Sequence, residues 1–409
     1  MANVLARLSN GRWLTRERVM IVAGITLAVT VLVLAFLAVT ARSDVDILGR
    51  PVGTDFASFY AAGKAALAGE PGAPYDPARQ HAEEQALFGA ATPFYAWQYP
   101  PFFLLLAAPL AALPYALALF VWQAATLGFC LLVVRAIFLA TGAPLDRLWW
   151  LPVVGAPAVF VNCGHGQNGF LSAALIGAGL VQLDRRPWLA GICFGLLAYK
   201  PQLALLIPVV LLATGRWRAI AAGVATVAVL ALAVTALFGA SVWQAFHAST
   251  AMTRTDLLEN GGPGWEKIVT VFAWLRMWGG SVALAYAAQA LATLAIAAAL
   301  VWLWRSHARP GLKAAALVIA AVAAAPFSLD YDMTVTGIAV AFLAADGIAA
   351  GFAPWQKTAL AALWLAPLFA RSAGSAHIPL GIIVMLAALA VVVHSALDRR
   401  FIGGTINPR

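Results

Sequence analysis

VMIVAGITLAVTVLVLAFLAVTA, residues 19–41, is a run of 23 residues without a charged side chain. About 20 consecutive apolar residues span a bilayer as a helix, so this run predicts a transmembrane helix. It exceeds the apolar core of about 7–15 residues in a signal peptide, and further apolar runs follow it, which favours a retained anchor over a cleaved signal. We therefore expect the fold of an integral membrane protein.

Residues 42–98, directly after this helix, form a polar loop that holds seven acidic and four basic residues. Nearly everything downstream is apolar again. Hydrophobic residues make up 63% of the chain and charged residues 11%, against about 25% charged residues in a soluble domain. We expect one polytopic all-α domain, 1–409, with 42–98 as a loop subdomain and 241–281 as a second polar loop.

The apolar runs predict about twelve membrane crossings, some of them too short for upright full spans. Segment 99–113 is also apolar, but a crossing there would invert everything after it, so we interpret it as re-entrant or interfacial. Spans 188–199 and 201–214 meet at Tyr199–Gln202, where a proline interrupts the helix, and broken helices of this kind line cavities. The expected crossings are 19–41, 115–140, 148–162, 166–183, 188–199, 201–214, 219–240, 282–304, 314–327, 335–350, 354–371 and 378–395.

The basic residues indicate an orientation. Of the 26 Lys and Arg residues, 16 fall on the side of the N-terminus and 8 on the opposite side, as the positive-inside rule requires of a cytoplasmic N-terminus. Both termini would then be cytoplasmic and the acidic loop extracytoplasmic. The net charge of +9 lies in short loops between apolar runs, so we expect no nucleic-acid partner. The cytoplasmic set includes Arg185, Arg186, Arg216, Arg218, Arg399, Arg400 and Arg409.

Two segments of the first polar loop have the composition of short amphipathic helices. Residues 56–68 (FASFYAAGKAALA) hold good helix formers and spaced aromatics, and residues 77–89 begin with Pro77, which suits the first turn of a helix. We expect both to lie along the membrane surface. The loop at 260–267 (NGGPGWEK) predicts a flexible turn that carries an aromatic side chain.

Ionisable groups at membrane depth are costly and therefore mark functional sites. Four polar clusters fall at the outer ends of predicted spans and are expected to converge on one pocket. Each has a plainer interpretation: a helix cap for Asp55, a snorkelling side chain for Lys200, solvated acids at 330 and 332, and satisfied backbone in the glycine-rich turn. The clusters are Asp55, residues 162–168 (NCGHGQN), Lys200, and the pair Asp330 and Asp332.

Metal and redox chemistry receive little support from the sequence. The three cysteines lie in or beside apolar runs without paired spacing, and no His, Asp and Cys cluster has metal-ligand spacing. His165 is isolated and suits a hydrogen-bonding role. We expect no cofactor, although a divalent ion between Asp55 and the acids of 328–332 stays possible.

Ordered motifs across residues 50–220 resemble glycosyltransferase family 87, a group of polytopic enzymes in the GT-C superfamily. These motifs are GTDFASFY (53–60), GE (69–70), PYD (74–76), QYPPF (98–102), GQN (166–168), AG (190–191), KPQ (200–202) and RWR (216–218). The resemblance implies a GT-C-like bundle that takes a sugar, typically mannose, from a polyprenyl phosphate and transfers it with inversion. After residue 220 the resemblance weakens, and residues 328–332 (SLDYD) stand where mycobacterial-type members carry a histidine-containing stretch.

The resemblance also implies residue roles. Asp55 matches the acid of the first external loop and would be the general base, while Lys200 would stabilise the lipid phosphate. The expected donor site comprises Lys200, Gln202, His165, Gln167, Asn168 and Tyr99. The expected acceptor or sugar site comprises Tyr60, Asp330, Asp332 and Trp265.

The implied partners are a polyprenyl-phosphate sugar, a glycolipid or glycan acceptor, and the bilayer, in a bacterial inner membrane. A transporter or lipid-linked-sugar flippase that uses Lys200, Asp330 and Asp332 is the alternative from another class. A structural subunit would leave the polar clusters without a role. An alanine-rich helix surface packs equally well within one chain or between two, so the sequence favours no oligomeric state.

Overall fold

The computed structural model describes residues 2–397. This part of the chain consists of helices joined by turns and loops, and it contains three isolated β-bridges and no β-strand. Six segments are long and apolar enough to cross a bilayer. Their exposed faces carry large apolar side chains, such as Ile21, Leu32 and Phe36 on the first and Leu232 on the third, as expected of surfaces that face lipid. The six are α2 (Arg16–Thr40), α6 (Tyr115–Thr141), α13 (Trp217–Phe238), α16 (Val282–Arg305), the 3₁₀ segment η6 (Asp330–Val335) with α18 (Thr336–Ala350), and α20 (Leu380–Leu397).

Several of the twelve expected crossings are short or broken. Segment 148–162 divides into α7 (Leu151–Val154) and α8 (Pro157–His165), and segment 201–214 divides into α11 (Pro201–Ala204) and α12 (Ile207–Ala213). Each of these four pieces has a proline in its first turn, where the missing N–H is tolerated, and that proline cannot continue a preceding helix. The multi-span helical fold is thus found, while the number twelve stays a prediction.

The helix α10 (Pro187–Leu196), followed by η3 (Leu197–Tyr199), packs closely on α13. Gly191 makes this possible, because a Cβ there would lie 2.2 Å from the backbone oxygen of Ala219. Small residues at such crossings allow membrane helices to approach. The neighbouring α9 (Gly169–Gln182) and α17 (Pro310–Ala323) are buried for most of their length and form the centre of the bundle.

The first polar loop folds as a compact subdomain of α3 (Phe56–Leu67), η1 (Ala73–Tyr75) and α4 (Pro77–Phe88), extended by η2 (Pro101–Phe103) and α5 (Leu104–Ala111). Both expected helices are present, but α3 does not lie on a surface, because ten of its twelve residues are buried. Its Phe59 ring contacts Trp97, Tyr99 and Phe103, each within 6.4 Å. The eight residues of α5 are too few to cross the bilayer and instead pack against α3.

The second polar loop is also folded. It contains α14 (Ser241–Met252), a π-helical segment η4 (Thr253–Glu259), η5 (Trp265–Lys267) and α15 (Val271–Met277). The expected turn at 260–267 is closed by Trp265, which packs against Gly261 at φ +67°. The position of this loop was thus predictable from the sequence, whereas its helices were not.

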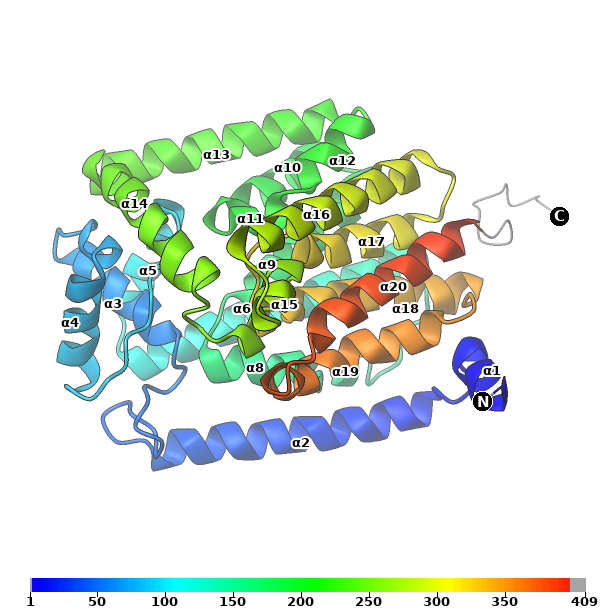
Figure 1. Cartoon of the computed structure of the whole chain (residues 1–409), viewed down its shortest axis with the longest axis horizontal. Helices are drawn as coiled ribbons and strands as arrows, with labels where there is room; N and C mark the ends of the chain where they lie inside the picture. The colour runs from blue at the N-terminus through cyan, green and yellow to red at the C-terminus, as the bar shows by residue number, and fades with distance from the viewer. Residues whose placement is uncertain (1, 398–409) are drawn as a thin grey trace.

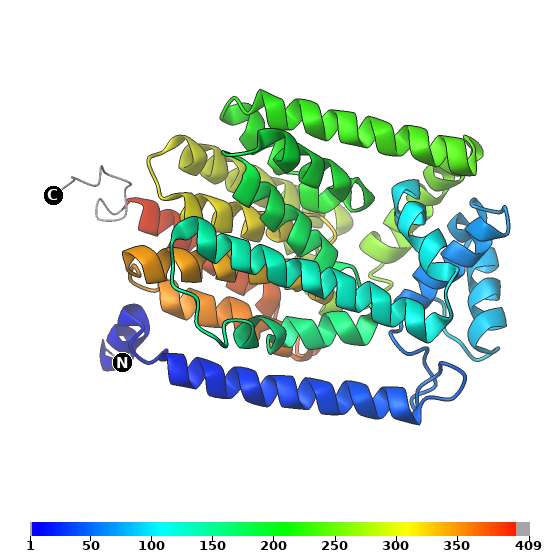
Figure 2. The same ribbon diagram turned by 180° about the vertical axis from the view of Figure 1, so that it is seen from behind.

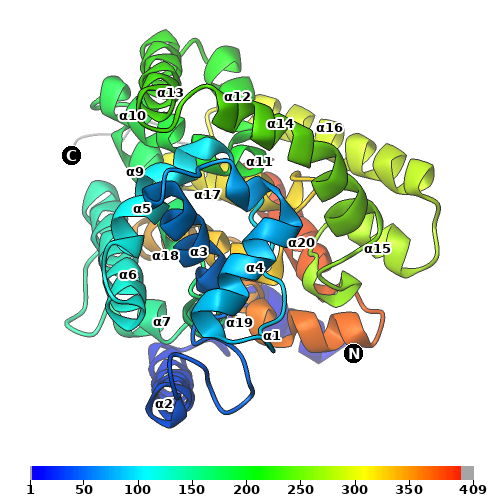
Figure 3. The same cartoon turned by 90° about the vertical axis from the view of Figure 1, so that its left-hand side faces the viewer.

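Figures 1 and 2 show the helices running roughly along one axis, with α2 lying apart along one side of the bundle. The subdomain of α3, α4 and α5 covers one end, which Figure 3 views directly. The α16–α17 turn and the turn from α18 to α19 (Gln356–Ser375) lie at the other end, where the second of these turns lies beside α1 (Ala2–Asn10). This end holds the basic turns of the sequence; Arg399, Arg400 and Arg409 lie outside the described residues.

Candidate active site

Asp55 stands at the start of α3, after a tight turn in which Gly53 has φ +81° and Thr54 has φ +26°. Its side chain makes no capping hydrogen bond to the helix, so the capping interpretation is wrong. Its Oδ2 instead accepts a hydrogen bond of 2.8 Å from the Gln167 side-chain amide. The carboxylate thus faces the glycine-rich turn, with 28% of its side chain exposed.

The glycine-rich turn between α8 and α9 is held rigidly. Gly166 ends α8 with φ +59°, and a Cβ there would lie 2.5 Å from the Cβ of Phe56. Asn162 donates to the Gln167 carbonyl at 3.0 Å and accepts from the Gly169 N–H at 2.9 Å. Trp122 donates to the Gly166 carbonyl at 3.0 Å. The turn therefore presents the Gln167 side chain in one orientation.

Gln167 links Asp55 to the interior of the protein. While its amide nitrogen donates to Asp55, its amide oxygen accepts from the Tyr99 hydroxyl and from the Asn168 N–H, both at 3.2 Å. Tyr99 comes from the QYPPF motif, and its position is fixed by the aromatic packing of the loop subdomain. Three motifs that are distant in sequence therefore meet at this side chain.

His165, the last residue of α8, lies on the other side of Asp55. Its Nδ1 is 2.8 Å from the Thr54 hydroxyl and 3.8 Å from Asp55 Oδ1. Its Nε2 is 3.0 Å from the guanidinium of Arg371, a residue of α19. The same guanidinium donates to Asp330 Oδ2 at 2.7 Å.

Lys200 lies at the break between η3 and α11. Its ammonium donates to Asp332 at 2.5 Å and to the Asn168 side chain at 2.9 Å, and it lies 5.1 Å from the centre of the Tyr331 ring. Only 4% of its side chain is exposed, so Lys200 does not snorkel. Asp332 compensates its charge, and Asp332 is itself held by the Leu329 N–H.

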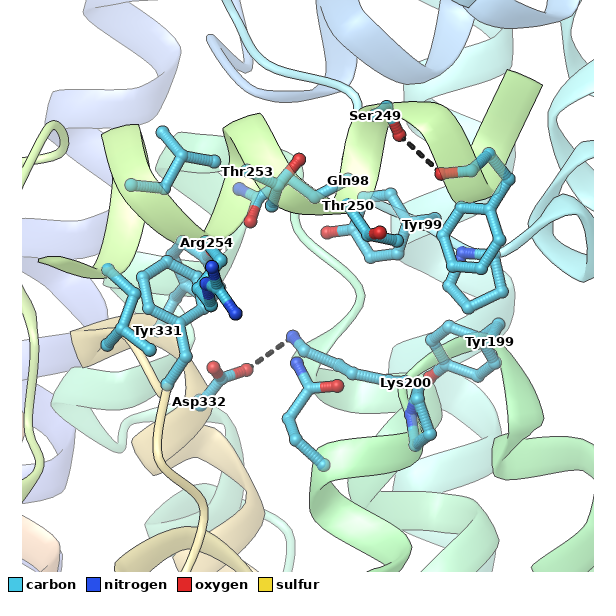
Figure 4. A pocket seen from close by; sticks show the side chains of 17 residues that line it. Gln98, Tyr99, Tyr199, Lys200, Ser249, Thr250, Thr253, Arg254, Tyr331 and Asp332 are labelled. Atoms are coloured by element: carbon cyan, nitrogen blue, oxygen red, sulfur yellow. Dashed lines mark hydrogen bonds and ion pairs between the residues drawn. The ribbon is translucent and has the colours of Figure 1, made fainter. Parts of the chain in front are cut away.

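A cavity of about 260 Å³ opens beside Lys200. Figure 4 shows Lys200 and Asp332 on one side of it and residues of α14 and η4 on the other, where Tyr99 lies beside Thr250 and Tyr331 beside Arg254. The second polar loop supplies three hydroxyls, from Ser249, Thr250 and Thr253, and the cation Arg254. The apolar lining includes Phe246, Leu257 and Phe327, and Gln202 borders the cavity as well.

The sequence profile of glycosyltransferase family 87 matches residues 97–328, more than half of the chain. The chain belongs to this family. It is therefore an enzyme that transfers sugars, and the transporter alternative is set aside. No curated protein and no solved structure matched the chain.

The matched segment of this glycosyltransferase contains the glycine-rich turn, Lys200 and the cavity wall of α14 and η4. Asp55, Asp332 and Arg371 lie outside it. The structure nevertheless brings all of them into one connected network. Tyr331 lies within this network: its ring centre is 6.1 Å from that of His165 and 5.1 Å from the Lys200 ammonium.

Two of the expected sugar-site residues lie elsewhere in this glycosyltransferase. Tyr60 is buried in the loop subdomain, where its hydroxyl donates to the Leu113 carbonyl at 2.9 Å. Trp265 packs on Gly261 and lies 5.5 Å from the Arg276 guanidinium. Neither lines the cavity or contacts Asp55.

Sequence reasoning missed two cations of the site. Arg254 and Arg371 were counted only as basic residues on the side of the acidic loop, although that side holds few of them. The signal that could have drawn attention to Arg254 is the run of hydroxyl residues around it at 249–255. For Arg371 there is no local signal, because its partners lie 41 and 206 residues away.

The acids of the site are engaged by cations. Asp330 pairs with Arg371 and Asp332 with Lys200, so a divalent ion would have to displace both partners. Within residues 2–397, no three His, Cys, Asp or Glu side chains are grouped so as to hold a metal ion. The residues themselves offer a carboxylate, an imidazole, amides and cations.

Proposed function

We propose that this membrane glycosyltransferase moves a sugar from a polyprenyl-phosphate-linked donor to an acceptor hydroxyl, with Asp55 as the general base. The observation that carries the proposal is the Asp55 carboxylate. It is held by Gln167, makes no helix cap and keeps part of its surface exposed. A carboxylate free of a structural duty, in reach of a substrate, suits proton acceptance.

In the proposed reaction, the acceptor oxygen forms a bond to the anomeric carbon while the bond from that carbon to the phosphate oxygen breaks. The acceptor proton passes to Asp55, and the electron pair leaves with the lipid phosphate. A single displacement of this kind inverts the anomeric carbon. Inversion and mannose as the sugar follow from the family resemblance.

The cavity beside Lys200 suits the phosphate of the donor. Its lining contains two cations that each have a carboxylate partner: Lys200 pairs with Asp332 at 2.5 Å, and Arg254 lies 3.4 Å from Glu259. An ammonium and a guanidinium supply charge-assisted N–H donors for a phosphate, and a monophosphate-linked donor follows from the family resemblance. When the lipid phosphate leaves it gains charge, and preorganised donors at that point lower the barrier. Gln167 and Asn168 connect this pocket to Asp55.

The acceptor would approach Asp55 from its exposed side, close to His165, Arg371 and Asp330. Buried carboxylates held by a guanidinium are suited to orienting sugar hydroxyls. A glycolipid, a polysaccharide and a protein hydroxyl are the candidate acceptors. We place the enzyme in a bacterial inner membrane with cytoplasmic termini and an extracytoplasmic site, because the basic turns gather at the end that holds α1.

The test is a transfer assay with purified protein in liposomes, labelled polyprenyl-phosphate mannose and a crude lipid extract as acceptor. Asp55→Asn is expected to lower the transfer rate by about 10²–10⁴-fold, the usual contribution of a general base. Asp76→Asn is the matched control, because Asp76 lies in the same loop but caps α4 through the N–H groups of Ala78 and Arg79. It should stay within about twofold of wild type, because asparagine caps a helix as well as aspartate does. Equal rates for wild type and Asp55→Asn would refute the base assignment.

A further inference from the structure

Arg371 reaches the neighbourhood of Asp55 from α19, far along the chain. Its guanidinium is anchored by Asp330, whose Oδ2 accepts from both Nε and a terminal nitrogen at 2.7 Å. Asp330 is 3% exposed, so the anchor is buried, whereas Arg371 is 40% exposed. The terminal nitrogen that contacts Asp330 also lies 3.0 Å from Nε2 of His165.

This contact fixes the protonation of the imidazole. A guanidinium has only N–H donors, so Nε2 of His165 must be the acceptor. A neutral imidazole that accepts at Nε2 carries its proton on Nδ1. That N–H faces the Thr54 hydroxyl at 2.8 Å and Asp55 Oδ1 at 3.8 Å. A protonated imidazole would instead set an N–H against an N–H of Arg371.

We propose that Arg371 is a positioning residue that holds His165 as the neutral Nδ1–H tautomer, with this N–H directed at Thr54 and Asp55. The consequence for the reaction rests on the proposed role of Asp55 as the base. An imidazolium at this distance would stabilise the ionised carboxylate and make it a weaker proton acceptor. A neutral imidazole orients the carboxylate without making it a weaker proton acceptor.

The charged groups around His165 come from four elements. Asp55 begins α3, Arg371 lies on α19, Asp330 on η6 and Lys267 on η5. Burial lowers the pKa of His165, Arg371 and Lys267 act in the same direction, and the two carboxylates oppose them. The net direction agrees with a histidine that stays neutral.

The assignment also limits where the proton can go. Nδ1 of His165 already carries a hydrogen, and Nε2 is occupied by Arg371. His165 therefore cannot relay a proton away from Asp55. The proton accepted by Asp55 must leave through the exposed part of its own side chain.

The direct test reads the tautomer and does not need activity. Protein labelled with ¹⁵N-histidine is placed in nanodiscs, and His165→Gln identifies the His165 signals among the six histidines. Wild type should show a neutral Nδ1–H imidazole at a pH equal to the ordinary histidine pKa of about 6.5, where a free imidazole is half protonated. Arg371→Gln should mix the tautomers and let His165 titrate closer to that ordinary value. Arg79→Gln, which removes an exposed ion pair with Glu70, should leave the His165 signals unchanged.

An Nε2–H tautomer or a protonated His165 in wild type at that pH would overturn the proposal, as would an unchanged spectrum in Arg371→Gln. Where Arg371→Gln does not fold, Asp330→Asn loosens the guanidinium while keeping the volume of the side chain, and the same shift is expected. Arg371→Lys keeps a cation with donors only and should restore part of the Nδ1–H signal.

Activity separates this proposal from the proposed function. The transfer rate of Arg371→Gln should fall toward low pH, and the double variant His165→Gln/Arg371→Gln should lose that fall. If the tautomer shifts as described but Asp55→Asn stays active, the positioning role stands and the base assignment fails. If Asp55→Asn is inactive and the tautomer does not respond to Arg371, the reverse holds.

Discussion

Gly166 is the residue on which the geometry of the site depends most directly. It adopts φ +59°, and a Cβ there would approach the Phe56 Cβ to 2.5 Å and the Gly53 carbonyl oxygen to 2.9 Å. Gly166→Ala should therefore combine about 1–2 kcal/mol of backbone strain with about 1–3 kcal/mol of overpacking. We expect lower thermal stability in nanodiscs and a strong loss of transfer, because the clash separates Gln167 from Asp55.

The control for this prediction is Gly142→Ala at the end of α6. Gly142 has φ +71°, yet a Cβ there would meet nothing within 4 Å. It should show only the strain of about 1–2 kcal/mol and near-normal transfer. Equal effects of both substitutions would mean that the contact with Phe56 does not matter.

The buried pair of Lys200 and Asp332 gives a second residue-scale prediction. Lys200→Met leaves the Asp332 carboxylate buried without its cation, a change that costs about 3–5 kcal/mol. The double variant Lys200→Met/Asp332→Asn removes both charges and should recover most of that stability. Transfer should stay low in both, because neither retains the ammonium for the lipid phosphate. The measurement is thermal unfolding beside the transfer rate; a stable Lys200→Met would show that the pair is only weakly coupled.

At the scale of an element, α4 is attached to the loop subdomain through Glu84. The carboxyl of Glu84 is fully buried and accepts from the Tyr95 N–H at 3.0 Å and the Gln80 amide at 3.1 Å. Burial raises its pKa from 4.5 to about 8. The folded subdomain therefore keeps a proton that the unfolded chain releases between these two values.

The sign of the effect follows from this difference. As pH rises from about 4.5 to about 8, the unfolded state binds fewer protons than the folded state, so the free energy of unfolding decreases, and above about pH 8 it is level. Each unit of pKa difference is worth about 1.4 kcal/mol, which makes the full effect a few kcal/mol. Glu84→Gln cannot ionise and should flatten the dependence, measured as protease resistance of the loop between pH 5 and 8. A slope as steep in Glu84→Gln as in wild type would assign the effect to another group.

The elements also show what the sequence could predict. Composition and the spacing of prolines and glycines are local properties, so they located α2, α3, α4, α6, α13 and α16 to within three residues at each end. Segments 148–162 and 201–214 were each expected to be one crossing because their apolar residues are continuous. Prolines divide both segments into helices of four to nine residues. The burial of α3 was missed because an alanine-rich and aromatic helix has the same composition on a membrane surface and in a core.

The site was predictable to the same extent. Short motifs pointed to Asp55, Gln167, Asn168 and Lys200, because a local turn or helix break positions each of these side chains. Arg371 could not be found that way, because its contact with His165 spans 206 residues and depends on the packing of the whole bundle. For the same reason the sequence could not predict that Asp330 anchors Arg371, while the expected role of Asp330 at the acceptor or sugar stays a prediction.

At the scale of the whole molecule, the arrangement of charge and the position of the site predict the topology. The subdomain of α3, α4 and α5 caps one end, and the turn between α16 and α17, with Arg305, Arg309 and Lys313, lies at the other. Basic residues concentrate on the cytoplasmic side of membrane proteins, so we expect the loop subdomain to lie outside. A donor held on a lipid phosphate is compatible with that side, because it needs no nucleotide.

Cysteine labelling tests this topology with two matched exposed positions. In a chain with Cys130, Cys163 and Cys193 replaced by alanine, Ala68→Cys lies at the end of α3 and His307→Cys lies in the α16–α17 turn. A membrane-impermeant maleimide added to intact cells should modify Ala68→Cys, and it should modify His307→Cys only after permeabilisation. The reversed pattern would place Asp55 and the Lys200 cavity in the cytoplasm, where a nucleotide sugar would become the available donor.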